Sequence, residues 1–248
     1  MRPSGASHCH RSLITNLKYS ANSDYDFTAE PLISSDQDNN YSAFSEELRA
    51  QTHLDLPINL MMGGYYQHTT LNFAQGAALY GSEDTLAPPG DQFIAYSKLS
   101  ATSGRTLAGF GQVTWKFLPE LEISAGSRYT DETKDSFFGQ PFVNPFYAAV
   151  YPAGDRVTAN QHFYNFSPET TLTWNAGRDL TLYGAYKTGY KSGGSSNSAI
   201  TSAFGNGAQD LTFKPETVRG IEAGVKAALL DRTLRFNFNA YRYEFSDL

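Results

Sequence analysis

The side chains that could do chemistry in this sequence are five histidines, one cysteine and scattered carboxylates, and their spacing fits no catalytic pattern. The histidines stand at positions 8, 10, 53, 68 and 162, without the spacing of a zinc site. His8, Cys9 and His10 are adjacent, but such a run near a chain start is more typical of an unstructured end. The sequence holds no Gly-x-Ser-x-Gly, His-Glu-x-x-His or Gly-x-x-x-x-Gly-Lys motif. It therefore predicts no catalytic residue, no metal and no cofactor.

Part of a calcium-binding loop is also visible. Asp36, Asp38 and Asn40, followed by Glu47, reproduce some of the oxygen ligands of such a loop. Tyr41, however, stands where the loop needs glycine for its sharp turn. We therefore predict no calcium site here.

Composition indicates a strand-rich chain that does not bind nucleic acid. The 248 residues include 16 Tyr, 17 Phe and 21 Gly, and only 18% are charged, which favours one all-β domain. The formal charge of -6, without a basic cluster, disfavours phosphate binding. A single cysteine excludes an internal disulfide framework. No apolar run approaches the ~18 to 20 residues of a membrane-spanning helix.

Alternating segments predict an all-β antiparallel up-and-down meander of about eight or nine long strands. Short connections join hairpins at Asp55-Leu56-Pro57, Leu118-Pro119-Glu120, Gly177-Arg178-Asp179 and Asp231-Arg232, and a further strand is expected near residues 11–21. Each strand is expected to have about 12 to 16 residues, against a usual 5 or 6. Long connections cover residues 22–40, 75–103, 139–160 and 194–213. Such alternation puts all long loops at one edge, which is typical of outer-membrane β-barrels.

Period-two alternation separates an apolar face from a polar face in these strands. A soluble antiparallel sheet alternates in the same way, but rings at the ends of the apolar stripes favour a membrane interface. The side chains predicted to face lipid are Trp115, Phe117, Trp174, Tyr186, Tyr190, Phe236 and Phe238. The charges predicted to face a hydrated lumen are Glu47, Arg49, Arg128, Glu169, Lys187, Lys191, Glu222 and Lys226. The run from Ser192 to Ser196 is expected to release the chain into a long external loop.

Two sets of side chains are candidates for ligand contact, and each has a structural alternative. The lumen-facing charges could line a ligand path, although pairing between neighbouring strands is the favoured interpretation. Rings in the long loops could stack on the flat or apolar face of a ligand, although packing between loops is slightly favoured. These loop rings are Tyr80, Phe93, Tyr96, Phe138, Phe142, Phe146, Tyr147 and Tyr151.

Several segments resemble the barrel domain of TonB-dependent outer-membrane receptors, energised importers of iron-siderophore complexes, cobalamin and some glycans. They are DYDFT at 24–28, FSEELRAQT at 44–52, GQVTWKF followed by AGSRYTDETK, SPETTLTW, YGAYKTGYKSGG, and KPETVRGIEAGVKAALLDRTLRFNFNAYRYEF. Together they cover about two thirds of the chain, in the order found in the family. The last segment is the most specific, because its Pro-Glu-Thr start, Glu222, Gly224 and Lys226 all match.

The resemblance implies that residues 11–248 are a curved part of a 22-stranded transmembrane barrel, after an unstructured start over residues 1–10. It implies the outer membrane of a Gram-negative bacterium, with membrane lipid and a small nutrient ligand as partners. Contact with the TonB complex would pass through a plug domain, and neither a plug nor a signal peptide is recognisable. The chain also stops at Ser246-Asp247-Leu248 rather than on a terminal aromatic. We therefore expect an internal piece of a receptor that does not transport alone, because nine strands cannot seal a wide lumen.

Other functions stay open from the sequence alone. A passive porin or another diffusion channel would share the strand pattern. A soluble or surface-exposed β-adhesin would share the alternation, and an outer-membrane enzyme could carry active residues that the motifs do not reveal.

Overall fold

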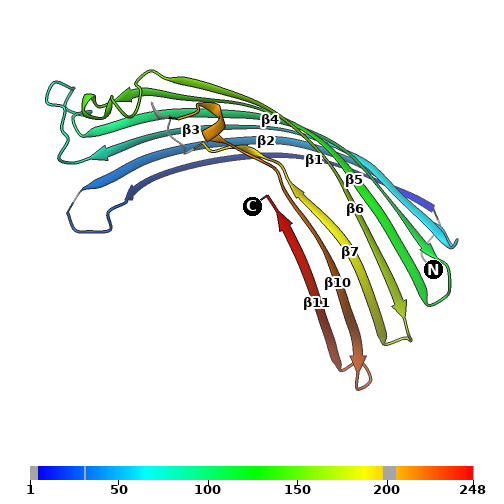
Figure 1. Ribbon diagram of the computed structural model, residues 1–248. Coiled ribbons are helices and arrows are strands. Elements are labelled where there is room, and N and C mark those ends of the chain that lie inside the picture. The colour runs from blue at the N-terminus through cyan, green and yellow to red at the C-terminus, as the bar shows by residue number, and fades with distance from the viewer. Residues whose placement is uncertain (1–4, 31, 198–204, 248) are drawn as a thin grey trace.

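The computed structural model describes residues 5–30, 32–197 and 205–247, most of which form one antiparallel sheet (Figure 1). Its nine strands pair in chain order: β1 (Gly5–Asp24), β2 (Ile33–His53), β3 (Ile58–Leu79), β4 (Ile94–Lys116), β5 (Leu121–Val143), β6 (Arg156–Asn175), β7 (Leu180–Lys191), β10 (Glu216–Leu229) and β11 (Leu234–Ser246). A small ladder joins β8 (Gly194–Ser195) to β9 (Thr212–Phe213), and two short helical turns are η1 (Pro145–Tyr147) and α1 (Ala208–Leu211). The predicted all-β meander of nine strands is confirmed.

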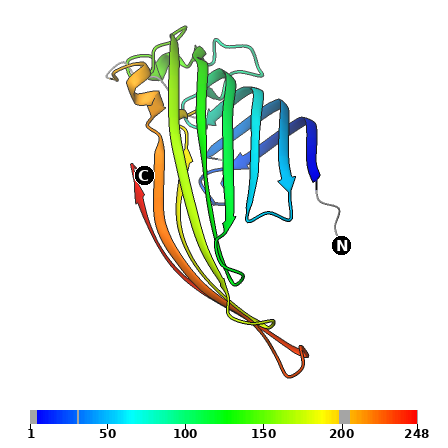
Figure 2. The ribbon, with the colours of Figure 1, turned by 90° about the vertical axis from the view of Figure 1, so that its right-hand side faces the viewer.

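The sheet is curved and open. Figures 1 and 2 show β1 and β11 as two separate edges of one wall, and among the described residues no ladder joins them. Unpaired edge strands carry free backbone donors and acceptors. A closed barrel pairs these groups with each other, and lipid cannot hydrogen-bond to them. The observed shape is therefore a segment of a barrel wall.

Six of the nine strands of the sheet are longer than the sequence predicted, while β7, β10 and β11 have the predicted length. Strands β1 to β6 have between 20 and 23 residues, so the long connections shrink to residues 25–32, 80–93 and 144–155. The extra length lies at the long-connection edge, where polar pairs continue the ladder: Asn22 Nδ2 donates to Asp36 Oδ1 at 2.7 Å, and Ser20 Oγ donates to Asp38 Oδ1. The alternation of apolar and polar residues therefore ends before the backbone pairing between the strands does. The alternation of short and long connections is nevertheless confirmed.

The expectation of an unstructured start is wrong for residues 5–10. Strand β1 begins at Gly5, which pairs with His53, and Ser7 Oγ lies 3.1 Å from His53 Nε2. Strand β2 extends to His53, so its backbone groups pair with residues 5–10. The local sequence of residues 5–10 does not reveal this pairing. Residues 1–4 lie outside the described part of the chain.

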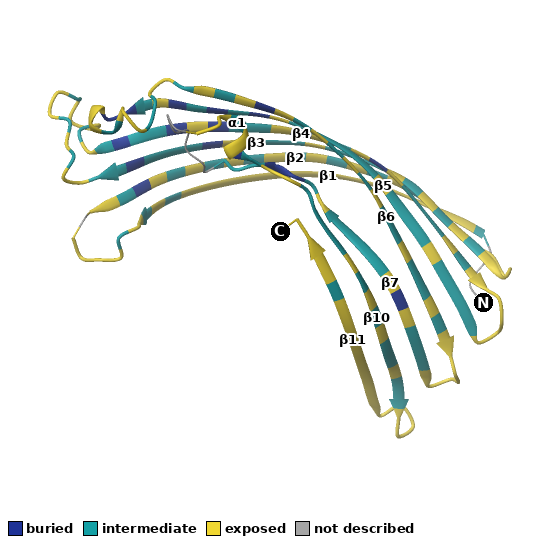
Figure 3. Ribbon diagram, viewed as in Figure 1, coloured by how far each residue is buried: buried dark blue, intermediate teal, exposed yellow. Residues whose placement is uncertain are grey.

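Exposed residues recur along all the strands of the sheet (Figure 3). On one face many of them are large and apolar, and the opposite face is more polar. On the exposed face, called the outer face here, Leu48, Phe166 and Phe238 are 61%, 60% and 59% accessible. Within the described residues no second layer covers these side chains. Sustained exposure of large apolar groups is atypical of a protein surface in water, so this face is built for an apolar surrounding.

Strand β1 departs from this division. Its register places Leu13 opposite Ser45 and Leu17 opposite Tyr41, on the inner face, whereas His10 lies opposite Leu48 on the outer face. Because side chains alternate strictly, a one-residue difference in register inverts a whole strand. The apolar outer face is therefore formed by β2 to β11, and β1 is an atypical edge.

The buried residues gather near the long connections. Phe73, Ala95, Phe138 and Val143 are almost inaccessible. The connections are also bonded to each other and to strands, since Asn144 Nδ2 donates to Ser82 O at 2.9 Å and its backbone N–H donates to Ala95 O at 2.8 Å. This edge is thus a consolidated rim. Among the described residues no helix is long and apolar enough to cross a membrane.

Candidate functional site

Four of the predicted lumen charges meet in one hollow on the inner face. Glu47 and Arg49 from β2, Arg128 from β5 and Glu169 from β6 line a space of about 320 Å³. The Arg128 guanidinium lies 5.0 Å from the Tyr65 ring centroid, which is within cation-π range. None of the four charges forms an ion pair with another described residue. Arg128 Nε donates to Thr130 Oγ1 at 3.2 Å, and Glu169 lies opposite Lys187 in the ladder, so the hollow presents charges that no direct ion pair neutralises.

Three of the remaining lumen charges, Lys187, Glu222 and Lys191, are paired across strands. Lys187 Nζ lies 2.8 Å from Glu222 Oε2, and the Tyr243 hydroxyl from β11 donates to the other oxygen of Glu222. Lys191 Nζ lies 3.0 Å from Glu216 Oε1. Lys226 has no ion pair within the described residues, but its Nζ lies 5.8 Å from the Tyr183 ring centroid. Cross-strand pairing therefore explains Lys187, Lys191 and Glu222, whereas Lys226 and the four charges of the inner hollow form no ion pair within the described residues.

The predicted ligand rings lie at the rim but contact one another. Tyr80 and Phe93 have ring centroids 5.1 Å apart, Tyr96 and Tyr151 are 6.3 Å apart, and Phe146 contacts the adjacent Tyr147 edge-on at 5.0 Å. The Tyr96–Tyr151 pair ties the top of β4 to the connection after β5. Phe146 is nevertheless 76% accessible. Mutual packing orders these rings and leaves some of their faces open.

Three of these rings lie in strands rather than in loops. Tyr96 is in β4, and Phe138 and Phe142 are in β5. The reason is the unexpected strand length described above. Phe138 is only 4% accessible, so its ring is part of the packing at the rim and not a surface for a ligand.

Six of the seven side chains predicted to face lipid are exposed on the outer side. Trp115, Trp174, Tyr186, Phe236 and Phe238 are on outer-face positions of their strands, and Phe117 follows β4 with its ring 5.6 Å from Trp115.

Tyr190 differs from this group. Its hydroxyl is buried without a hydrogen-bond partner among the described residues, and it lies beyond the point where β7 stops pairing with β6. The prediction for Tyr190 is therefore wrong, because β7 has parted from β6 at this height and its outward side faces the inner wall.

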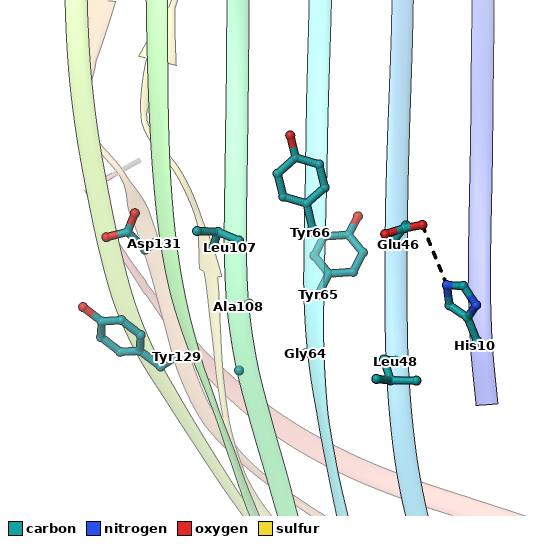
Figure 4. A pocket seen from close by; sticks show the side chains of 11 residues that line it. His10, Glu46, Leu48, Gly64, Tyr65, Tyr66, Leu107, Ala108, Tyr129 and Asp131 are labelled. Atoms are coloured by element: carbon teal, nitrogen blue, oxygen red, sulfur yellow. Dashed lines mark ion pairs between the residues drawn. The ribbon is translucent and has the colours of Figure 1, made fainter. Parts of the chain in front are cut away.

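A larger hollow lies on the outer face, between rings (Figure 4). It measures about 760 Å³ and opens where Gly64 and Gly109 leave space between Tyr66 and Tyr129. At its edge the His10 ring lies 3.8 Å from Glu46 Oε1. Its apolar lining and its position on the outer face suit an acyl chain of the membrane lipid. The candidate site for a nutrient ligand is therefore the inner hollow together with the rim.

Sequence reasoning missed several residues of the inner face. Tyr65 and Phe110 sit beside Arg128. Alternation places Phe110 on the polar face, but it does not reveal that the ring contacts Arg128. The run from Ser192 to Ser196 was expected to leave the wall, but it bonds to inner-face side chains instead. In the part of the chain described here, no three His, Cys, Asp or Glu side chains gather as a metal site.

The curved sheet, its exposed apolar outer face and its sorted connections define a wall of a β-barrel membrane protein. Residues 6–248 match the family described as TonB dependent receptor-like, beta-barrel. The chain belongs to this family, whose members are transport receptors of the Gram-negative outer membrane rather than enzymes.

Solved structures show the same fold. The ferric yersiniabactin uptake receptor FyuA from Yersinia pestis superposes with a TM-score of 0.75 at 16% identity, over 97% of this chain and 33% of that one. The ferric citrate transporter FecA in its unliganded form gives 0.62 at 14% identity, over 99% and 33%. This chain therefore spans about one third of the length of these relatives.

Proposed function

We propose that this chain is part of the barrel wall of an energised importer that takes up a small nutrient ligand through the outer membrane. The rim rings and the inner hollow would contact the ligand, and the outer face would contact lipid. One observation carries the proposal: large apolar side chains stay exposed on the outer face, while unpaired charges such as Arg49 and Arg128 line the inner face. A porin would share this division, but the family match favours a receptor.

The ligand class is part of the proposal. Both solved relatives are named for ferric complexes, so ferric chelates are the first candidates to test. Coupling to the TonB complex would pass through a plug domain. Because β1 and β11 are open edges, we also propose that the chain by itself does not transport.

The lipid-facing assignment can be tested with the two tryptophans of the chain. Trp115 and Trp174 both lie on the outer face near short turns, so tryptophan fluorescence reports this face alone. The chain refolded into vesicles of brominated phospholipid should lose most of this fluorescence relative to vesicles of unbrominated lipid.

A matched variant separates membrane insertion from loose adsorption. Trp115 and Trp174 are replaced by Phe, and Tyr183 on the inner face is replaced by Trp, which brominated lipid should quench much less. Equal quenching of inner and outer tryptophans would contradict the assignment of faces. No quenching of Trp115 and Trp174 would contradict the membrane role itself.

A further inference from the structure

The ladder between β6 and β7 stops at a proline. Strand β6 pairs with β5 from Arg156 to Trp174, but it pairs with β7 only from Glu169 onward. The Pro168 carbonyl faces β7 and accepts a hydrogen bond from Thr188 Oγ1 at 2.8 Å. The N–H and C=O of one residue point to the same side of a strand. Because the Pro168 carbonyl faces β7 and proline has no N–H, β6 lacks a backbone donor toward β7 at this residue. The chain after Thr188 is thereby released from β6, while it stays paired with β10 as far as Lys191.

The released chain folds over the inner face and is held there by Lys134. Lys134 Nζ donates to Ser192 Oγ and to Gly193 O, both at 2.7 Å, and lies 3.1 Å from Glu132 Oε1. We call residues 192–197 and 211–213 the strap. A half-buried ammonium with three oxygen partners is a stronger fastening than a neutral hydrogen bond.

The strap continues across three strands of the wall. Ser195 Oγ donates to Gln161 Oε1 of β6 at 3.1 Å, and Thr102 Oγ1 of β4 donates to Asn197 Oδ1 at 3.3 Å. Its two segments are joined to each other, since Ser196 N–H donates to Leu211 O at 2.8 Å. The strap thus covers β4, β5 and β6 from the inside.

Burial at the contact between the strap and the wall is close to complete. Leu211 is 2% accessible, and Ser136 on the inner face of β5, which bonds to Thr102 Oγ1 at 2.8 Å, is 5% accessible. At Gly193 an added Cβ would meet Phe213 O at 2.5 Å and the Phe163 ring at 2.8 Å. The strap therefore fits the wall closely, and only glycine fits at this point.

We propose that the strap is a displaceable constriction on the lumen side of the wall, with Lys134 as its latch. While the strap is docked, it covers the inner face of β4 to β6 at the height of Thr102, Lys134 and Gln161, and it leaves the inner hollow around Arg128 open. Release of Lys134 frees the covered part of β4 to β6. This inference concerns access to the inner face and goes beyond ligand uptake itself. It rests on the proposed function in one respect: the inner face, which the strap covers, is taken as the lumen side.

Cysteine labelling in detergent tests the strap directly. In a Cys9→Ser background of the full chain, Ser136→Cys lies under the strap and Ser45→Cys lies on the inner face of β2. A maleimide should label Ser136→Cys much more slowly than Ser45→Cys. Adding Lys134→Met should raise the Ser136→Cys rate by about 10- to 100-fold, because charge-assisted hydrogen bonds are lost, and should leave Ser45→Cys unchanged.

Lys226→Met is the matched control, since Lys226 faces the same lumen without touching the strap, and it should not alter either rate. If Lys134→Met fails to fold by circular dichroism, Gly193→Ala provides an independent way to undock the strap. Equal labelling of Ser136→Cys and Ser45→Cys in the parent would overturn the docked state. A Ser136→Cys rate unaffected by both Lys134→Met and Gly193→Ala would overturn the latch.

Discussion

Asp26 shows how one side chain orders a whole connection at the rim. Its carboxylate accepts hydrogen bonds from the backbone N–H groups of Thr28, Leu32 and Ile33 at 2.9, 3.0 and 2.8 Å. The hydroxyl of Thr28 and these N–H groups hold the pKa of the Asp26 carboxyl well below its usual range. The charged form is therefore the one that the folded connection requires.

The first prediction concerns Asp26→Asn, which should speed amide exchange at Leu32 and Ile33. Because the folded pKa is lowered, the stabilisation is fully present above the ordinary carboxyl pKa of about 3.9 and fades as pH falls toward the folded value. Exchange protection at these amides, measured by mass spectrometry, should thus be flat from neutral pH to about pH 4. Glu30→Gln, in the same connection, is the control. Equal protection in Asp26→Asn and the parent would contradict this role.

Some glycines in the strands determine how neighbouring strands pack, because rings from those strands occupy the space above the glycines. At Gly220 in β10, an added Cβ would lie 2.2 Å from the Tyr243 ring and 2.4 Å from Arg242 O. Tyr243 in turn donates to Glu222, so ring, glycine and carboxylate fix the pairing of β10 with β11. At Gly109 in β4, by contrast, an added Cβ meets nothing within 4 Å.

Gly220→Ala should therefore destabilise the sheet, by about 1 to 3 kcal/mol as for other overpacked sites. Gly109→Ala should be neutral or slightly stabilising, because the strand interior loses a flexible residue and no contact is crowded. Urea unfolding in detergent, followed by tryptophan fluorescence, measures both variants. A similar loss for the two variants would show that backbone flexibility, and not the Tyr243 ring, decides the effect.

Charge is distributed over the whole molecule in a way that bears on the ligand. The four long connections, residues 25–32, 80–93, 144–155 and 192–215, hold seven of the 25 acidic residues and one of the 19 Lys and Arg. The rest of the chain has 18 of each and is neutral, so the connections carry the entire net charge of -6. Among the described residues none of these seven carboxylates is in an ion pair. Such a rim repels anions and attracts cations.

A cationic ferric trihydroxamate should consequently bind the chain more tightly than the anionic ferric citrate, by about threefold to tenfold at 20 mM salt. The difference should shrink at 500 mM salt, because screening shortens the reach of the rim charges. Calorimetry in detergent gives both affinities. Glu83→Gln with Asp91→Asn should reduce the preference, and Glu120→Gln, in a short turn at the opposite edge, should not. Preference for citrate would contradict the charge argument, whereas no binding of either chelate would contradict ligand capture by the rim.

The sequence by itself determined the strands, their alternating faces and the sorting of short and long connections. These features follow from local periodicity and turn residues, as in the run from Trp115 through Leu118 to Ile123. Only the tertiary structure decided the length of β1 to β6, the gathering of Glu47, Arg49, Arg128 and Glu169 in one hollow, and the inward course of the strap. Strand length depends on whether a neighbour supplies an edge, and Gly5 pairs only because β2 reaches His53. The burial of Tyr190 depends on Pro168 in the neighbouring strand. The alternation of residues within one strand cannot reveal such a dependence on another strand.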